Sequence, residues 1–92
     1  MPTIRRLVLD VLKPHHPSIA EFAMLIAEQD PSYRVKITVV EIDEHTESIV
    51  MVVDGDNIRY DEIAETITNM GGSVHSIDEV EVTGAPAANL TD

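Results

Sequence analysis

Carboxylates near the ends of strand-like segments are the side chains of this 92-residue chain best placed to do chemistry. Glu41 and Asp43 are two residues apart, so on a strand they would lie on one face. Asp78 and Glu79 lie in the last strand-like segment. Four carboxylates brought together repel one another unless a cation, or Arg5 and Arg6, lies between them. Oxygen-only ligation favours Ca²⁺ or Mg²⁺ over zinc. The first hypothesis is therefore a divalent-cation site at these four residues.

A second set of ionisable residues comprises Asp10, His15 and His75. Histidine and aspartate together can bind a metal ion or exchange protons near neutral pH. Their spacing matches no compact metal or catalytic motif, so a structural pairing of Asp10 is favoured over catalysis. The alternative hypothesis makes this set the ligand site of a small-molecule regulatory module, with the ligand bound between subunits. An enzymatic role ranks last, because the sequence spacing assembles no acid–base pair.

Hydropathy patterns predict the elements that position these residues. Apolar residues alternate with polar ones, as strands require, over residues 4–12, 35–42, 48–54 and 73–82. The spacing typical of an amphipathic helix covers residues 18–29 and 59–70. Ser18 followed by Glu21 is a capping-box pattern at the start of the first helix, and Gly71 is a C-cap signal after the second.

The predicted element order is βαββαβ, which is that of the ferredoxin-like split βαβ sandwich. Right-handed crossovers give a four-stranded antiparallel sheet in the order 4-1-3-2 with both helices on one face. The predicted fold class is therefore α+β, with one domain over residues 1–83. Residues 84–92 are small and polar, and we expect them to form a disordered C-terminal tail.

The sheet face that carries no helix is predicted to be apolar. Residues expected on it are Val8, Leu12, Val40, Ile42 and Ile77. A sheet face with these side chains is too apolar to remain in water, so a partner surface is expected to cover part of it. The second and fourth strands, at the two edges, are open to pairing with another subunit. Self-association is the expected outcome.

Strand directions that alternate along the chain would bring the ends of the first and third strands to the starts of the second and fourth. On that basis Asp10, His15 and His75 gather at one end of the sheet, and the four carboxylates gather at the other. The carboxylates belong to opposite edges, so only a neighbouring subunit can bring them together. In a head-to-tail ring with its axis along the strands, the two edge strands would run in the same direction. A cation there, Ca²⁺ in the first place, would couple ion binding to assembly.

The charge balance restricts the possible partners. Seventeen Asp and Glu residues against six Lys and Arg residues give a formal net charge of −11. Such a surface repels phosphates and anionic lipids, so neither a nucleic acid nor a membrane is an expected partner. A halophilic cytoplasm favours the same composition, so solvated surface charge explains the acidic excess as well as a cation site does. The chain has no cysteine and no apolar run of about 18 residues, and a cytoplasmic protein is expected.

Several segments together resemble the signature stretches of an archaeal family of uncharacterised proteins, the domain-of-unknown-function family 211. These segments are LDVLKPH at 9–15, EID at 41–43, YDEI at 60–63 and GGSVHSIDEV at 71–80. The resemblance implies a ferredoxin-like fold and a ring-like homo-oligomer, and it implies no established activity. The chain departs from the family in its greater acidity, which suits a haloarchaeal member, and in His16, where the family tends to have an acidic residue.

Overall fold

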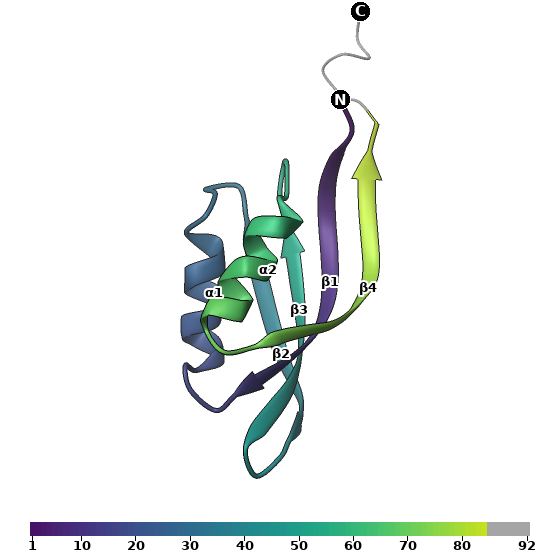
Figure 1. The fold of residues 1–92 in the computed structure, drawn as a ribbon. Coiled ribbons are helices and arrows are strands. Elements are labelled where there is room, and N and C mark those ends of the chain that lie inside the picture. The colour runs from purple at the N-terminus through teal and green to yellow at the C-terminus, as the bar shows by residue number, and fades with distance from the viewer. Residues whose placement is uncertain (85–92) are drawn as a thin grey trace, which may run out of the picture.

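The computed structural model describes residues 1–84, which form one four-stranded sheet covered by two helices (Figure 1). The elements are β1 (Thr3–Pro14), α1 (Ile19–Ala27), β2 (Arg34–Ile42), β3 (Thr46–Asp54), α2 (Tyr60–Asn69) and β4 (Ser73–Thr83). The sheet order is β2-β3-β1-β4, and every neighbouring pair is antiparallel. The predicted ferredoxin-like α+β fold is therefore confirmed. Most of the expected C-terminal tail, residues 85–92, lies outside the described residues.

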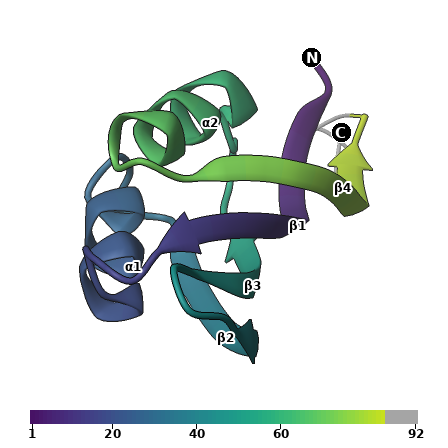
Figure 2. The same cartoon turned by 60° about the horizontal axis from the view of Figure 1, so that its bottom comes forward.

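Alternating side chains of the central strand β1 form the middle of the core. Leu7, Leu9 and Val11 are at most 1% exposed, and they face the helices. Figures 1 and 2 show both helices on this side of the sheet. Lys13 continues the same alternation and is also fully buried, although it carries a charge. The other face of the sheet carries no helix, and we call it the open face.

Local signals set the ends of the helices as predicted. The Ser18 hydroxyl accepts a hydrogen bond from the Glu21 backbone N–H, and the Glu21 carboxylate accepts one from the Ser18 N–H, which completes the capping box. After α2, Gly71 has a φ of +88°, a conformation that costs glycine little because it has no β-carbon. The buried stripes of both helices, which include Phe22 and Ile67, then pack on the sheet.

The direction of the strands corrects one prediction. Because α1 returns the chain to its starting end, β2 runs parallel to β1, as it must in a βαβ unit. The ends of β1 and β2 therefore meet the starts of β3 and β4, and the simple alternation of directions was wrong. Glu41 lies at the Lys13 end of the sheet, in the same cross-strand row as Leu12. Glu79 is paired with Val8, four residues or about 13 Å away along the strands.

Three bulges in the edge strands alter which side chains share a face. In β4 the extra residues opposite β1 are His75 and Asp78, so Ile77 pairs with Leu9 on the helix-facing side. In β2 the register shifts after Val39, which places Ile42 opposite Glu47 on the helix-facing side as well. The prediction that Ile42 and Ile77 lie on the open face was therefore wrong, because a bulge reverses the alternation of side chains.

Two other predicted positions on the open face are confirmed. Val8 pairs with Val52, and Leu12 pairs with Ser48, both on the face opposite the buried β1 side chains. Asp10 lies between them, paired with Val50. The centre of the open face therefore combines apolar side chains with one carboxylate, Asp10, and one hydroxyl, Ser48.

Candidate functional site

The four carboxylates of the predicted cation site do not meet within one chain. Glu41 and Asp43 lie at the end of β2, at one edge of the sheet, and Asp78 and Glu79 lie on β4, at the other. Within residues 1–84 no three His, Asp or Glu side chains are close enough together to hold a metal ion. Only neighbouring copies can bring the four carboxylates together, so the site stays a prediction.

The antiparallel relation of β2 and β4 also changes how copies would meet. In a ring whose axis runs along the strands, β4 of one copy would lie antiparallel to β2 of the next, so the expectation of a common direction was wrong. If the neighbouring copy extended the sheet without a shift along the strands, Glu41 would lie opposite Ser73 of that copy. To reach Asp78 and Glu79, the neighbour would have to shift by about 13 Å along the strands.

Two of the three residues of the alternative ligand site lie together. Asp10 and His75 line a surface hollow of about 290 Å³, together with Leu12 and Ser48. The bulge at His75 re-aims this part of β4 relative to Asp10. His15 lies elsewhere, in the connection from β1 to α1, where it contacts Glu47 and the Glu44 carbonyl. The structure thus retains a hollow with one carboxylate and one imidazole.

The open face carries opposite charges at its two edges. One cross-strand row, from the β2 edge to the β4 edge, is Arg34, Asp54, Arg6 and Glu81. The next row in the same direction is Lys36, Val52, Val8 and Glu79. In these two rows the cations lie at the β2 edge and the carboxylates at the β4 edge.

The cations of this face surround one hollow. Arg6, Arg34 and Lys36, three of the six basic residues of the chain, line a depression of about 320 Å³ together with Asp54. Arg6 is already paired, because its Nη1 lies 3.1 Å from Asp54 Oδ1 and its Nε lies 2.7 Å from Glu79 Oε2. Within residues 1–84 neither Arg34 nor Lys36 has an ion-pair partner. In a chain with a net charge of −11, these two cations are available to a second molecule.

The helix-facing side of both edges exposes apolar side chains. At the β2 edge, Met24 and Leu25 of α1 are 66% and 42% exposed. At the β4 edge, Ile77, Val80 and Val82 are 46%, 49% and 53% exposed. Figures 1 and 2 show the reason for the second patch: the far end of β4 runs beside β1 away from both helices, so no helix covers it.

A buried ion pair closes the opposite end of the sheet. The Lys13 ammonium donates to the Pro14 carbonyl at 2.7 Å and to Glu47 Oε1 at 3.2 Å. It also lies 5.1 Å from the centre of the Phe22 ring, within the range of a cation–π contact. Lys13 is fully buried and Glu47 is 17% exposed. A buried ammonium is tolerated only with such partners, because its desolvation is otherwise costly.

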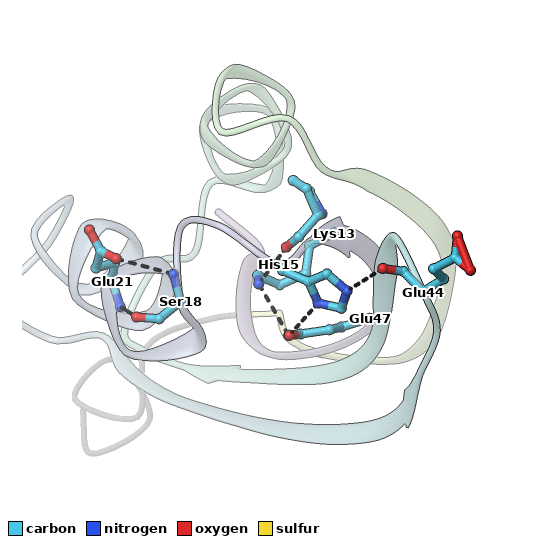
Figure 3. A network of polar contacts seen from close by, with 7 residues as sticks. Lys13, His15, Ser18, Glu21, Glu44 and Glu47 are labelled. Atoms are coloured by element: carbon cyan, nitrogen blue, oxygen red, sulfur yellow. Dashed lines mark hydrogen bonds and ion pairs between the residues drawn. The ribbon is translucent and has the colours of Figure 1, made fainter.

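His15 joins this pair to the β2–β3 hairpin, as Figure 3 shows. Its Nδ1 lies 3.0 Å from Glu47 Oε2, and its Nε2 lies 3.0 Å from the Glu44 carbonyl oxygen. The Glu47 carboxylate, and then the Glu44 carbonyl, raise the pKa of His15 above its ordinary value. In return His15, and then Lys13, lower the pKa of Glu47. Each of the two groups therefore stabilises the charged form of the other.

Comparison with known proteins fits this architecture. Residues 5–87 match the model of the DUF211 family, which is described as uncharacterised ArCR. The chain belongs to the DUF211 family. It is also 48% identical over 80 residues to an uncharacterised protein, MJ0319, of Methanocaldococcus jannaschii, a match that covers 87% of this chain and 82% of the relative. The resemblance predicted from the sequence segments is confirmed, while the haloarchaeal origin stays a prediction.

Sequence reasoning missed the best-packed polar group of this DUF211 protein. Lys13 stands at the next core-facing position after Leu7, Leu9 and Val11, and that alternation signals a buried lysine that needs a carboxylate. Glu47 then follows from the β1–β3 register, which no local pattern reveals.

Neither helix of the described residues is long and apolar enough to cross a membrane.

Proposed function

We propose that this DUF211 chain is a non-enzymatic structural protein that assembles head to tail into a ring-like homo-oligomer. The β2 edge of one copy would pair with the β4 edge of the next. The observation that carries the proposal is the opposite charge of the two edges on the open face, with Arg34 and Lys36 at one and Glu79 and Glu81 at the other. Both edges also present unpaired backbone groups, which favour strand addition.

The cross-strand rows specify the contact. When β4 of the next copy continues the sheet without a shift, Arg34 faces Glu81 and Lys36 faces Glu79 of that copy. Opposite charges directly across antiparallel strands stabilise the pairing by about 0.2–1 kcal/mol each, and like charges there are destabilising. The same charges disfavour the pairing of two β2 edges or of two β4 edges. Each contact therefore joins a β2 edge to a β4 edge, head to tail.

The apolar patches on the helix-facing side support the same arrangement. Since α1 packs over β2, it would stand next to the far end of β4 of the next copy. Met24 and Leu25 would then cover Ile77, Val80 and Val82, which no helix of their own chain covers. A heterologous contact of this kind gives a ring when the rotation between copies closes.

A charge exchange tests the proposal. Arg34→Glu and Glu81→Arg should each lower the solution mass measured by light scattering, because each variant places like charges across every contact. A mixture of the two variants restores opposite charges at both kinds of contact and should recover the mass, as should the double variant. Glu65→Arg, on the exposed surface of α2, is the matched control and should leave the mass unchanged. Unaltered mass in both single variants would refute the edge contact.

The assembly could instead be held by a divalent cation, Ca²⁺ in the first place. Its ligands would be four carboxylates of adjacent copies, those of Glu41, Asp43, Asp78 and Glu79. It needs the shift of about 13 Å along the strands that would separate Arg34 from Glu81. The two contacts therefore exclude each other. Glu41→Gln combined with Asp43→Asn should weaken assembly if the cation holds the ring. It should leave assembly intact if the ring is held by the charge rows, the pairs of Arg34 with Glu81 and of Lys36 with Glu79 between copies.

The Asp10–His75 hollow supports a second candidate function, a regulatory module with a small ligand between subunits. The hollow lies on the open face beside the β4 edge, where a neighbouring copy would border it. This function predicts that Asp10→Asn alters ligand binding and leaves assembly unchanged. We place it second, because the charge rows are complementary to a second copy of the chain, whereas the hollow indicates no specific ligand.

A further inference from the structure

Strand β3 anchors the β2–β3 hairpin to β1 as far as Thr46, and one imidazole from outside the hairpin reaches its tip. The turn itself is closed by the Asp43 backbone N–H, which donates to the Thr46 carbonyl at 2.8 Å. Glu44 and His45, at its tip, are exposed and contact each other. The contact that reaches the tip from another element is that of His15 with the Glu44 carbonyl.

We propose that His15 is a proton-dependent clamp that holds the tip of the β2–β3 hairpin against the connection from β1 to α1. Both ring nitrogens lie 3.0 Å from an acceptor, one from the Glu47 carboxylate and one from the Glu44 carbonyl. Only the imidazolium donates at both nitrogens, since neutral imidazole carries one N–H and one lone pair. Deprotonation therefore turns one of the two contacts into a repulsion between lone pairs.

The neighbours of His15 decide which contact is lost. Glu47, from β3, is also bonded to the buried Lys13 of β1, so it stays ionised and in place when His15 becomes neutral. A neutral imidazole then keeps its N–H on the carboxylate, the stronger acceptor, and releases the Glu44 carbonyl. From α1, Phe22 contacts Lys13 and the Glu21 carboxylate is engaged by the Ser18 N–H, so neither opposes the switch.

The sign of the effect follows from the same contacts. The pKa of His15 is raised, first by Glu47 and then by the Glu44 carbonyl, so the clamp is closed at acidic pH. It opens as the pH rises through the raised pKa. The core does not open with it, because the Lys13–Glu47 pair does not depend on the proton of His15.

A pH titration followed by NMR tests the clamp. In a chain with His45→Gln, which removes the other imidazole that contacts Glu44, the Glu44 carbonyl carbon shift and the backbone order parameters of residues 43–46 should change in one step, together with the ring signals of His15. Adding His15→Gln should abolish that step at all four residues. His16→Gln in the same background is the matched control, because His16 is an exposed neighbour in the same connection, and it should retain the step. A step that survives His15→Gln, or a Glu44 signal that does not follow His15, would overturn the proposal.

Discussion

Lys13 and Glu47 face each other directly across β1 and β3, with the ammonium 3.2 Å from the carboxylate and the lysine fully buried. The pair lies at the end of the core where the strands meet the hairpin, and it replaces an apolar contact that the alternation of β1 would otherwise provide. Removing one partner of a buried ion pair is costly when it leaves the other charge buried without a counter-charge.

The first prediction compares two variants, each of which removes one member of that pair. Lys13→Met should change the free energy of unfolding by less than about 2 kcal/mol, because an apolar side chain of similar length fills the site and Glu47 keeps His15. Glu47→Gln should be the more destabilising change, because it leaves a buried ammonium without its counter-charge. Urea unfolding at neutral pH measures both, and the reverse order of the two variants would contradict this account of the pair.

The second prediction concerns the loss of stability as the pH rises. The pKa of His15 is higher in the folded chain than its ordinary value of 6.5, so the stability that it contributes is complete below pH 6.5 and is lost as the pH rises through the folded value. His15→Gln should flatten this part of the curve of unfolding free energy against pH. His16→Gln should leave the curve unchanged, since His16 is exposed.

The third prediction concerns stability at acidic pH. The pKa of Glu47 is lowered, first by His15 and then by Lys13, below its ordinary value of 4.5. Its contribution is therefore present above pH 4.5 and is lost as the pH falls through the folded value. Glu47→Gln should remove this loss, whereas Glu65→Gln, at an exposed position of α2, should retain it. Unfolding free energies measured across this range decide the matter.

The fourth prediction concerns the apolar patches. Met24→Glu and Val80→Glu should each lower the solution mass while leaving the far-ultraviolet circular dichroism unchanged, because both side chains are about half exposed or more in the single chain. Ile67→Ala is the contrasting variant. It removes part of a fully buried side chain and should cost about 2–5 kcal/mol of folding stability. Assembly that is insensitive to both glutamate variants would remove α1 and β4 from the contact.

Much of the fold follows from the sequence because its signals are local. The alternation through Leu7, Leu9 and Val11 predicts a half-buried strand, and the reciprocal bonds of Ser18 and Glu21 begin α1 where the pattern indicates. Element order alone then gives the sheet topology.

The errors arose where the outcome depends on partners distant in sequence. The bulges at His75 and Asp78 leave no mark in the hydropathy pattern, yet they reverse the face of Ile77. The Lys13–Glu47 pair depends on the β1–β3 register, which joins residues 34 positions apart. The ends of the sheet at which Glu41 and Glu79 lie follow from the parallel return of β2 after α1, which a simple alternation of directions neglects.

Light scattering of the wild-type chain, at low salt and then with EDTA, tests the central claim of head-to-tail assembly most directly. The account predicts a mass several times the 10.1 kDa of one chain, retained after chelation, because charge rows and apolar side chains hold the contact. A mass that falls with EDTA and recovers with Ca²⁺ would indicate that a cation site holds the contact, at Glu41, Asp43, Asp78 and Glu79. A mass of 10.1 kDa throughout would contradict the assembly itself.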